Sequence, residues 1–453
     1  MGQLPWKNLN VIDMSSNKLQ GHLPLPPPST VEFLISNNKL VGGLPSSICS
    51  LHSIQFLDLS SNSLSGNLPS CIGNASDGLE LLNLGMNQFF GTIPLTFTKG
   101  NSLKYLNLHG NQFEGSLPHS LLNCKILEFV DVGNNKINGS FPQWLESLPE
   151  LQVLILRSNR FSGPIGNPKT RFSFQQLRII DLSSNDFTGP LPTNFFGTLV
   201  GMMDAHSDYL EYMEEYIVTN ATLSSYYQYS LAMTIKGSNI ELEKIQTMFI
   251  AIDFSRNYFS GEIPKSIGKL NSLKGLSLSH NKLTGTIPSS LGNLSNLEWL
   301  DLSSNELFGK IPWQLATDLN QLGFLNLSNN KLEGPIPRGP QFNTFKDDSY
   351  GGNLALCGFP LSKLCSEDAA NVPTWPTQQE GEDDEHAIGF DWKVVVMGYG
   401  SGFVIGISVG YMVLTDKTID WLVESVRGSA QRRRSVKRSK KNIHANGGIR
   451  RRN

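Results

Sequence analysis

The chain has 453 residues, a length that by itself suggests two or three domains. Its five cysteines are too few for a fold held together by disulfides, and its eight histidines are scattered without metal-ligand spacing. We therefore expect no metal and no other cofactor. The formal net charge of −2 is an average over segments of opposite sign, so it identifies no class of partner.

A repeated pattern begins near Leu9 and overrides the estimate from length. It reads L-x-L-x-x-N-x-L-x-G-x-I/L-P, as in LDLSSNSLSGNLP at residues 57–69. Eight repeats lie in residues 1–199 and four in residues 249–345. Their asparagines are spaced mostly 24 residues apart, with one large gap: Asn17, Asn38, Asn62, Asn87, Asn111, Asn135, Asn159, Asn185, Asn257, Asn281, Asn305 and Asn330.

Each repeat predicts one short strand, because its L-x-L segment alternates inward leucines with outward variable residues. Successive strands are expected to stack into one parallel sheet. The asparagine after each strand is expected to turn inward and to hydrogen-bond backbone groups that would otherwise be buried unpaired. We therefore predict an α/β-type repeat solenoid, curved, with a large concave surface for binding.

Residues 200–248 interrupt the repeats and form a predicted island between them. This tyrosine-rich stretch contains no L-x-L-x-x-N unit, and a loop of such length is normally functional. Its segment YSLAMTIKG alternates like a strand, and IELEKI is a suitable partner strand. The alternative interpretation is a degenerate repeat or a disordered insertion.

A single transmembrane helix is predicted over residues 392–415, where 394–414 form 21 consecutive uncharged residues. The acidic juxtamembrane segment 366–391 holds eight acids and no Lys or Arg, whereas the tail 416–453 holds twelve Lys or Arg against three acids. Because basic residues stay on the cytoplasmic side, this asymmetry predicts a type I protein with its N-terminal region outside. The alternative, a nucleic-acid or nuclear-localisation patch, fits a tail directly after a span less well.

The predicted span has a glycine at every fourth position: Gly398, Gly402, Gly406 and Gly410. In hydrocarbon, small residues at this spacing let two helices approach closely and pack. We therefore predict that these glycines contact the helix of a partner membrane protein.

The G-x-I/L-P ending of the repeats resembles the plant extracellular type of leucine-rich repeat. Plant leucine-rich-repeat receptor-like proteins carry such repeats, a segment similar to GPQFNTF (339–345), a cysteine pair like that in GNLALCGFPLSKLC (352–365), an acidic stretch, a glycine-rich span and a short basic tail, in the order found here. The resemblance implies a horseshoe-shaped solenoid at the plasma membrane. No enzyme activity is expected, because the 38-residue tail is too short for a kinase domain.

The resemblance also implies partners. In that family the island helps to bind the ligand, and the last repeats and the C-terminal cap, here 346–365, meet a co-receptor kinase. The span meets an adaptor receptor kinase. TIKG, with Lys236 and Gly237, matches a motif of the family's islands. Family members begin with a secretion signal and a cysteine-bearing cap, which MGQLPWKNLN does not resemble, so we expect an N-terminally truncated form.

Candidate ligand contacts are outward residues of the solenoid and tyrosines of the island, whose rings give rigid, amphipathic contact area. The expected ligand is a peptide, a protein or a glycan, and no nucleic acid is expected. The candidate residues are Lys104, Tyr105, His109, Glu128, Arg157, Arg178, Tyr226, Tyr227, Tyr229, Lys236 and Gly237.

The cysteines and the N-glycosylation sequons fit an extracellular region. Cys357 and Cys365 are expected to form a disulfide that closes the cap. Cys49, Cys71 and Cys124 are expected to be small buried side chains. Five sequons fall on the predicted external side: Asn74, Asn138, Asn220, Asn293 and Asn326.

Two functions remain open at this point. The leading hypothesis is an immune receptor-like protein that recognises a microbial or damage-derived ligand and signals in defence through partner kinases. The alternative is a developmental receptor-like protein that works with a peptide-hormone receptor kinase. If the missing N-terminus is natural, a non-functional or decoy product is a third outcome.

Overall fold

The computed structural model describes residues 8–74, 78–94, 96–203, 211–219 and 222–365, which belong to one compact unit, Met1–Val372. The predicted juxtamembrane segment, span and tail lie outside the described residues, and so do Gly398, Gly402, Gly406 and Gly410. Across the described ranges, no helix is long and apolar enough to cross a membrane.

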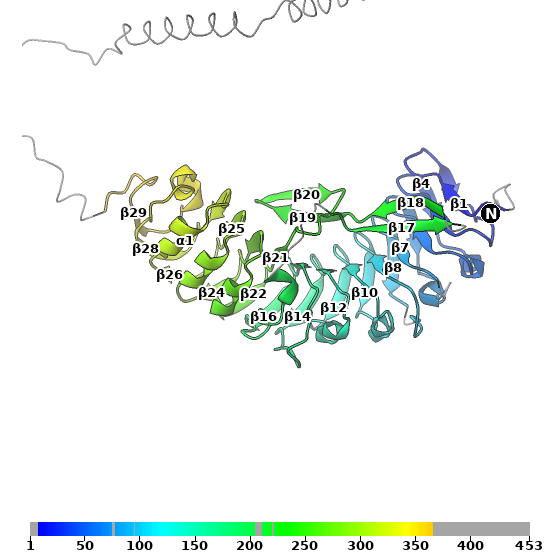
Figure 1. The fold of residues 1–453 in the computed structure, drawn as a ribbon, viewed down its shortest axis with the longest axis horizontal. Helices are drawn as coiled ribbons and strands as arrows, with labels where there is room; N and C mark the ends of the chain where they lie inside the picture. The colour runs from blue at the N-terminus through cyan, green and yellow to red at the C-terminus, as the bar shows by residue number, and fades with distance from the viewer. Residues whose placement is uncertain (1–7, 75–77, 95, 204–210, 220–221, 366–453) are drawn as a thin grey trace, which may run out of the picture. The chain divides into compact units, whose positions relative to one another are not determined.

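Each repeat contributes a three-residue strand to a 12-stranded parallel sheet (Figure 1). Neighbouring strands pair at the same repeat position, so that Asp58 pairs with Asn83. One side of the sheet packs into the solenoid core, and we call the other side the sheet face. The strands are β1 (Val11–Asp13), β3 (Glu32–Leu34), β5 (Phe56–Asp58), β7 (Leu81–Asn83), β9 (Tyr105–Asn107), β11 (Phe129–Asp131), β13 (Val153–Ile155), β15 (Ile179–Asp181), β21 (Ala251–Asp253), β23 (Gly275–Ser277), β25 (Trp299–Asp301) and β27 (Phe324–Asn326).

A second strand in most repeats follows the asparagine turn, because the residues up to the G-x-I/L-P ending are extended. These strands form a ten-stranded parallel sheet and, at the C-terminal end, a three-stranded one. The bounds are β2 (Gln20–His22), β4 (Lys39–Gly42), β6 (Ser63–Gly66), β8 (Gln88–Thr92), β10 (Gln112–Gly115), β12 (Lys136–Gly139), β14 (Arg160–Gly163), β16 (Asp186–Pro190), β22 (Tyr258–Glu262) and β24 (Lys282–Thr284), then β26 (Phe308–Gly309), β28 (Lys331–Pro335) and β29 (Ala355–Cys357).

Short helices return the chain to the next repeat. Among the described residues all but one of these helices are 3₁₀ helices. Four of the 3₁₀ helices and α1 begin directly after the proline of a G-x-I/L-P ending, which is their extended N-cap residue. They are η1 (Ser46–Ser50), η2 (Ile72–Asn74), η3 (His119–Asn123), η4 (Gln143–Ser147), η5 (Val200–Met202), η6 (Lys265–Lys269), η7 (Ser289–Asn293), η8 (Phe342–Thr344), η9 (Asp347–Ser349) and the single α-helix α1 (Trp313–Asp318).

The repeat asparagines bond to backbone groups of the turn, as predicted, and they also link consecutive repeats. Asn87 is buried, and its amide donates to the carbonyl oxygens of Leu59, Leu84 and Gly85 at 3.0, 3.2 and 3.1 Å. Its side-chain oxygen accepts the backbone N–H of Leu64 at 3.0 Å. The same arrangement recurs along the solenoid, so one side chain satisfies backbone groups of two neighbouring repeats.

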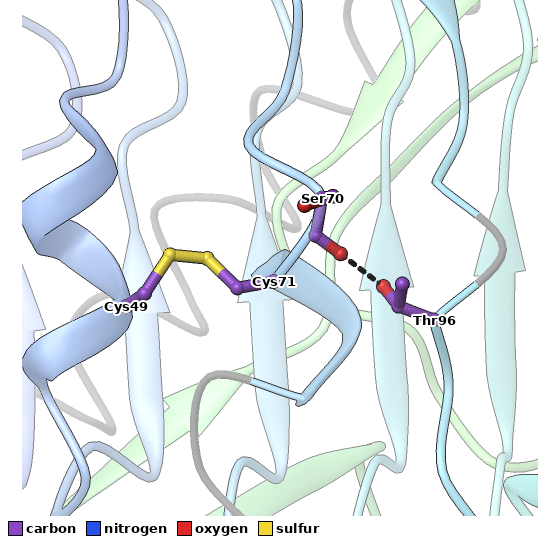
Figure 2. Close-up of a disulfide and its surroundings, with 4 residues drawn as sticks. All are labelled: Cys49, Ser70, Cys71 and Thr96. Atoms are coloured by element: carbon purple, nitrogen blue, oxygen red, sulfur yellow. Dashed lines mark hydrogen bonds between the residues drawn. A yellow bond between two sulfur atoms is a disulfide. The ribbon is translucent and has the colours of Figure 1, made fainter.

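Two disulfides are present among the described residues. Cys357 and Cys365 are joined, in agreement with the prediction for the C-terminal cap. The expectation that Cys49 and Cys71 are separate buried side chains is wrong, because they form a second disulfide (Figure 2). They lie 22 residues apart, close to one repeat length, so stacking brings their Cα atoms to 5.9 Å. Cys124 is a free, buried thiol.

Candidate functional site

The island folds into two antiparallel hairpins that lie beside the 12-stranded sheet (Figure 1). The first pairs β17 (Glu214–Thr219) with β18 (Thr222–Gln228), and the second pairs β19 (Leu231–Ile235) with β20 (Ser238–Leu242). The second hairpin confirms the predicted pairing of YSLAMTIKG with IELEKI. Lys236 and Gly237 of TIKG both have positive φ and form its two-residue turn, a conformation for which glycine is favoured.

A second hydrophobic core joins the island to the sheet face. The first residue of most strands in the 12-stranded sheet is apolar, and these side chains point away from the solenoid core. The island covers them with Met213, Tyr229, Leu231, Met233 and Ile235. The sheet-face members of this second core are Phe56, Leu81, Tyr105, Phe129, Val153, Ile179, Ala251 and Trp299, with Ile155 also included.

Two predicted ligand tyrosines are buried in this core rather than exposed. Tyr105 has no exposed surface, and its ring centroid lies 4.6 Å from that of Tyr229 and 4.3 Å from that of Phe129. The expectation that Tyr105 faces solvent is therefore wrong, because the alternation within one repeat cannot show that an island covers the outward side. Tyr227 is partly buried and bonds to the solenoid, whereas Tyr226 is 55% exposed.

The predicted charged residues at the edge of the sheet face also meet the island. Lys104 binds Glu80 at 2.9 Å and the island residue Glu215 at 2.7 Å. Partial burial lowers the pKa of Lys104. The two carboxylates raise this pKa by more than burial lowers it, so the net shift is upward. Burial raises the pKa of Glu128 to about 7, and the negative charge of Glu215 adds to the shift. Arg178 donates to the carbonyl oxygen of Thr247.

A polar groove remains open between the β19–β20 hairpin and the sheet face. Its volume is about 540 Å³. Its titratable lining residues are Arg157, Arg256, His280 and Asp301. Burial and the charge of Arg256 lower the pKa of His280, which favours its neutral form. The other lining residues are small or polar: Asn134, Ser158, Ser183, Ser184, Thr234, Gly237, Asn239, Ser255, Ser277, Ser279, Ser303 and Asn326.

A smaller hollow of about 340 Å³ lies further toward the N-terminal repeats and shares Asn134 with the groove. Here the predicted residue His109 contacts Asp131 through Nδ1 at 3.3 Å and Asn134 through Nε2 at 3.1 Å. The hollow is closed on the island side by Leu231 and Glu241. The groove and the smaller hollow therefore both lie between the repeats and the β19–β20 segment of the island.

Most of the predicted residues thus fall into two groups, whereas Tyr226 is exposed and belongs to neither. Arg157 and Gly237 line the groove, Lys236 forms a 3.9 Å ion pair with Glu298 beside its turn, and His109 lines the smaller hollow. The second group joins the island to the repeats: Tyr105 and Tyr229 pack in the second core, Lys104 forms an ion pair with Glu215, and Arg178 donates a hydrogen bond to Thr247. Sequence reasoning missed Arg256, His280 and Asp301, although all three occupy outward positions in or just after an L-x-L segment.

The sequons also lie in different environments. Asn138 on β12 and Asn293 on η7 are exposed. Asn326 on β27 is partly buried and lines the groove, and its side-chain oxygen accepts the backbone N–H of Ser328 at 3.1 Å. Asn74 ends η2, and Asn220 lies outside the described residues. Glycosylation at these asparagines stays a prediction.

Known proteins share the leucine-rich repeats of this chain. Leucine-rich-repeat family profiles match residues 53–75, 102–124, 176–198, 251–307 and 271–332. Receptor-like protein 54 of Arabidopsis thaliana is 42% identical over 410 residues, which cover 89% of this chain and 50% of that protein. Receptor-like protein 7 of the same species is 45% identical over 430 residues, which cover 94% of this chain and 44% of that protein.

The chain belongs to the leucine-rich-repeat receptor-like proteins. It spans about half the length of the curated relatives it matches. Solved plant ectodomains share the solenoid of this receptor-like protein. The ectodomain of the Arabidopsis thaliana receptor kinase GASSHO1/SCHENGEN3, in complex with CASPARIAN STRIP INTEGRITY FACTOR 2, matches with a TM-score of 0.56 and 28% identity, covering 79% of this chain and 42% of that one.

The Arabidopsis receptor kinase HAESA, in complex with the peptide hormone IDA and a co-receptor, matches this receptor-like protein with a TM-score of 0.56 and 31% identity. The match covers 76% of this chain and 53% of that one. The shared feature is therefore the repeat solenoid.

Proposed function

We propose that this receptor-like protein binds an extracellular, hydrophilic peptide in the polar groove between β19–β20 and the sheet face. The lining of the groove carries the proposal. Its described residues include seven serines, two arginines, a histidine and an aspartate, and none is a Phe, Tyr, Trp or aliphatic residue. Such a surface offers hydrogen bonds and charges to an extended backbone, but it gives no platform on which a sugar ring stacks.

The solved complexes support a peptide as the ligand class. The HAESA structure holds a peptide hormone and a co-receptor. The groove of this chain runs across several neighbouring repeats, from Asn134 to Asn326, as an extended ligand requires. Arg157 and Arg256 favour an acidic group in the ligand, because guanidinium groups bind carboxylates with charge-assisted hydrogen bonds.

The signalling role is a further proposal. We propose that this receptor-like protein signals through partners: an adaptor receptor kinase at the glycines of the predicted span, and a co-receptor kinase at the last repeats and the cap. We favour defence as the output, with development as the alternative. Transcript induction by microbial elicitors supports defence, and constant expression confined to meristems supports development.

Site-specific photo-crosslinking tests the binding proposal. A photo-reactive amino acid replaces Ser255 in the groove of the full chain, which is then exposed to the small-peptide fraction of a microbial culture filtrate or of plant extracellular fluid. We expect a peptide to be cross-linked at Ser255 and not at Lys265, an exposed position on η6. Equal cross-linking at both positions, or none at Ser255 from either fraction, overturns the groove as the binding site.

A further inference from the structure

Asp181 and Asp253 form a pair on neighbouring strands beneath the island. They are far apart in sequence but are register partners on β15 and β21. Both project toward the sheet face, because the residues on either side of each in the sequence belong to the solenoid core. Their exposed fractions are nevertheless 0% and 1%. The pair is therefore covered from the island side.

The cover over this pair is the β19–β20 hairpin. Two residues before the aspartates, Ile179 and Ala251 belong to the second core together with Met233 of β19. Two residues after them, Ser183 and Ser255 line the groove together with residues of the hairpin. The carboxyl groups thus lie at the border between the apolar contact of β19 and the groove. The sequence of β19, LAMTI, contains no titratable side chain.

Each carboxyl group has one satisfied and one unsatisfied oxygen. Oδ1 of Asp181 and Oδ1 of Asp253 each accept a backbone N–H two residues later, at 2.9 Å. Oδ2 of each is buried and has no hydrogen-bond partner among the described residues. Asp58 has the same position in its own repeat, but there the island supplies a donor, the hydroxyl of Tyr227. The β19–β20 hairpin supplies none.

The charges that face the pair give incomplete compensation. Arg157 is the nearby cation that acts on Asp181, whereas Asp131 acts on Asp181 as a like charge. Asp253 faces Asp181 and Asp301, both negative. Burial raises the pKa of Asp253 to about 8, and the charge of Asp181 adds to the shift. Burial also raises the pKa of Asp181, and the hydrogen bonds from Ser183 and the charge of Arg157 oppose this shift.

We infer that Asp181 and Asp253 hold a shared proton beneath β19 and act as a pH-dependent latch on the β19–β20 hairpin. This inference rests on the proposed function, because the hairpin is one wall of the proposed peptide groove. One proton is bound when the hairpin closes and released when it opens. In the closed state the protonated carboxyl donates to its neighbour, which satisfies oxygens that otherwise lack a partner.

The sign of the pH dependence follows from the raised pKa. The closed state keeps a proton that an exposed aspartate, with a pKa of about 4, has already lost. Closure is therefore fully favoured at low pH and weakens as the pH rises from about 4 to the pKa of about 8. Near pH 8 both Asp181 and Asp253 are negatively charged beneath the apolar strand β19, so the hairpin opens. The groove then loses the wall that Thr234 and Asn239 provide.

Hydrogen exchange of the full 453-residue chain at pH 5, 6.5 and 8 tests the latch without any ligand. We expect protection factors of the β19 and β20 amides to fall at least tenfold from pH 5 to pH 8. The upper limit for one proton is about tenfold per pH unit. Amides of β17 and β18 are followed separately, because Glu128, which has a raised pKa of its own, acts on Tyr229 at that end of the island.

Asp253→Asn keeps the acceptor for the backbone N–H of Ser255 but removes the titration of Asp253 and its negative charge beside Asp181. We therefore expect protection of β19 and β20 to be high and to change less than twofold with pH. The matched control is Asp13→Asn, at the same repeat position but exposed, which keeps the wild-type pH dependence. Asp181→Asn is the second variant if Asp253→Asn does not fold. Equal wild-type protection at pH 5 and pH 8, or unchanged pH dependence in the Asn variants, overturns the latch while the groove proposal stands on its cross-linking result.

Discussion

The hydroxyl of Tyr227 donates a 2.9 Å hydrogen bond to Oδ2 of Asp58, a residue 169 positions earlier in the chain. The same hydroxyl accepts a 2.8 Å hydrogen bond from the side-chain amide of Asn83. Burial raises the pKa of Asp58, and the hydrogen bonds from Ser60 and Tyr227 oppose this shift because they stabilise the carboxylate. One island side chain therefore satisfies two polar groups of the sheet face.

Tyr227→Phe is expected to loosen the β17–β18 hairpin. It removes a hydrogen bond to a charged group, which is worth about 1.5–3 kcal/mol, so amides of β18 should exchange roughly tenfold to a hundredfold faster. Hydrogen exchange measures this. Tyr226→Phe is the matched control, because Tyr226 is its neighbour and is exposed. Similar exchange in the two variants would show that the hydroxyl of Tyr227 does not hold the hairpin.

Asn87→Ala is expected to destabilise the solenoid. The change leaves three carbonyl groups and the N–H of Leu64 without the partner they have in the wild type. Unsatisfied buried groups of this kind cost about 1–3 kcal/mol, which should appear as a lower denaturation midpoint. Asn17→Ala is the control, because exposed Asn17 bonds within its own turn among the described residues, and the change should cost less than about 0.5 kcal/mol. A cost at Asn17 equal to that at Asn87 contradicts the argument.

Gly275→Ala is expected to displace the indole of Trp299. A Cβ at Gly275 would overlap that ring, which stacks on Phe249 at a centroid distance of 5.8 Å. Overpacking of this kind costs about 1–3 kcal/mol, and thermal unfolding should report it. Gly166→Ala introduces the same methyl group where the nearest atom is 3.7 Å away, so its midpoint should stay close to that of the wild type. Equal unfolding midpoints of the two variants would show that the Trp299 ring moves aside without loss of stability.

Arg256→Ala is expected to weaken binding of an acidic peptide in the groove. Loss of one charge-assisted hydrogen bond costs about 1.5–3 kcal/mol, so cross-linking at Ser255 should need at least about tenfold more peptide. Lys136→Ala is the control, because Lys136 is exposed on β12, outside the groove. Unchanged cross-linking in Arg256→Ala would remove that residue from the binding surface.

The repeat pattern alone determined the solenoid. Its leucines every second residue fix which side of each strand is buried, and its asparagine fixes the turn that joins neighbouring repeats, as Asn87 shows. Both relationships are local and recur in every repeat, so the periodicity of the sequence is enough to predict them. The pairing of β19 with β20 was also local, because two alternating segments are joined by the turn at Lys236 and Gly237.

Only the tertiary structure decided what covers the sheet face. Periodicity marks Tyr105, Asp181 and Asp253 as outward, but it contains no information on where a distant insertion folds back. The island turns those outward positions into a second core and a buried acid pair. The disulfide between Cys49 and Cys71 has the same origin, because repeat stacking, and no local motif, brings the two residues together. Burial of an outward position depends on contacts between segments far apart in the chain, which local patterns do not encode.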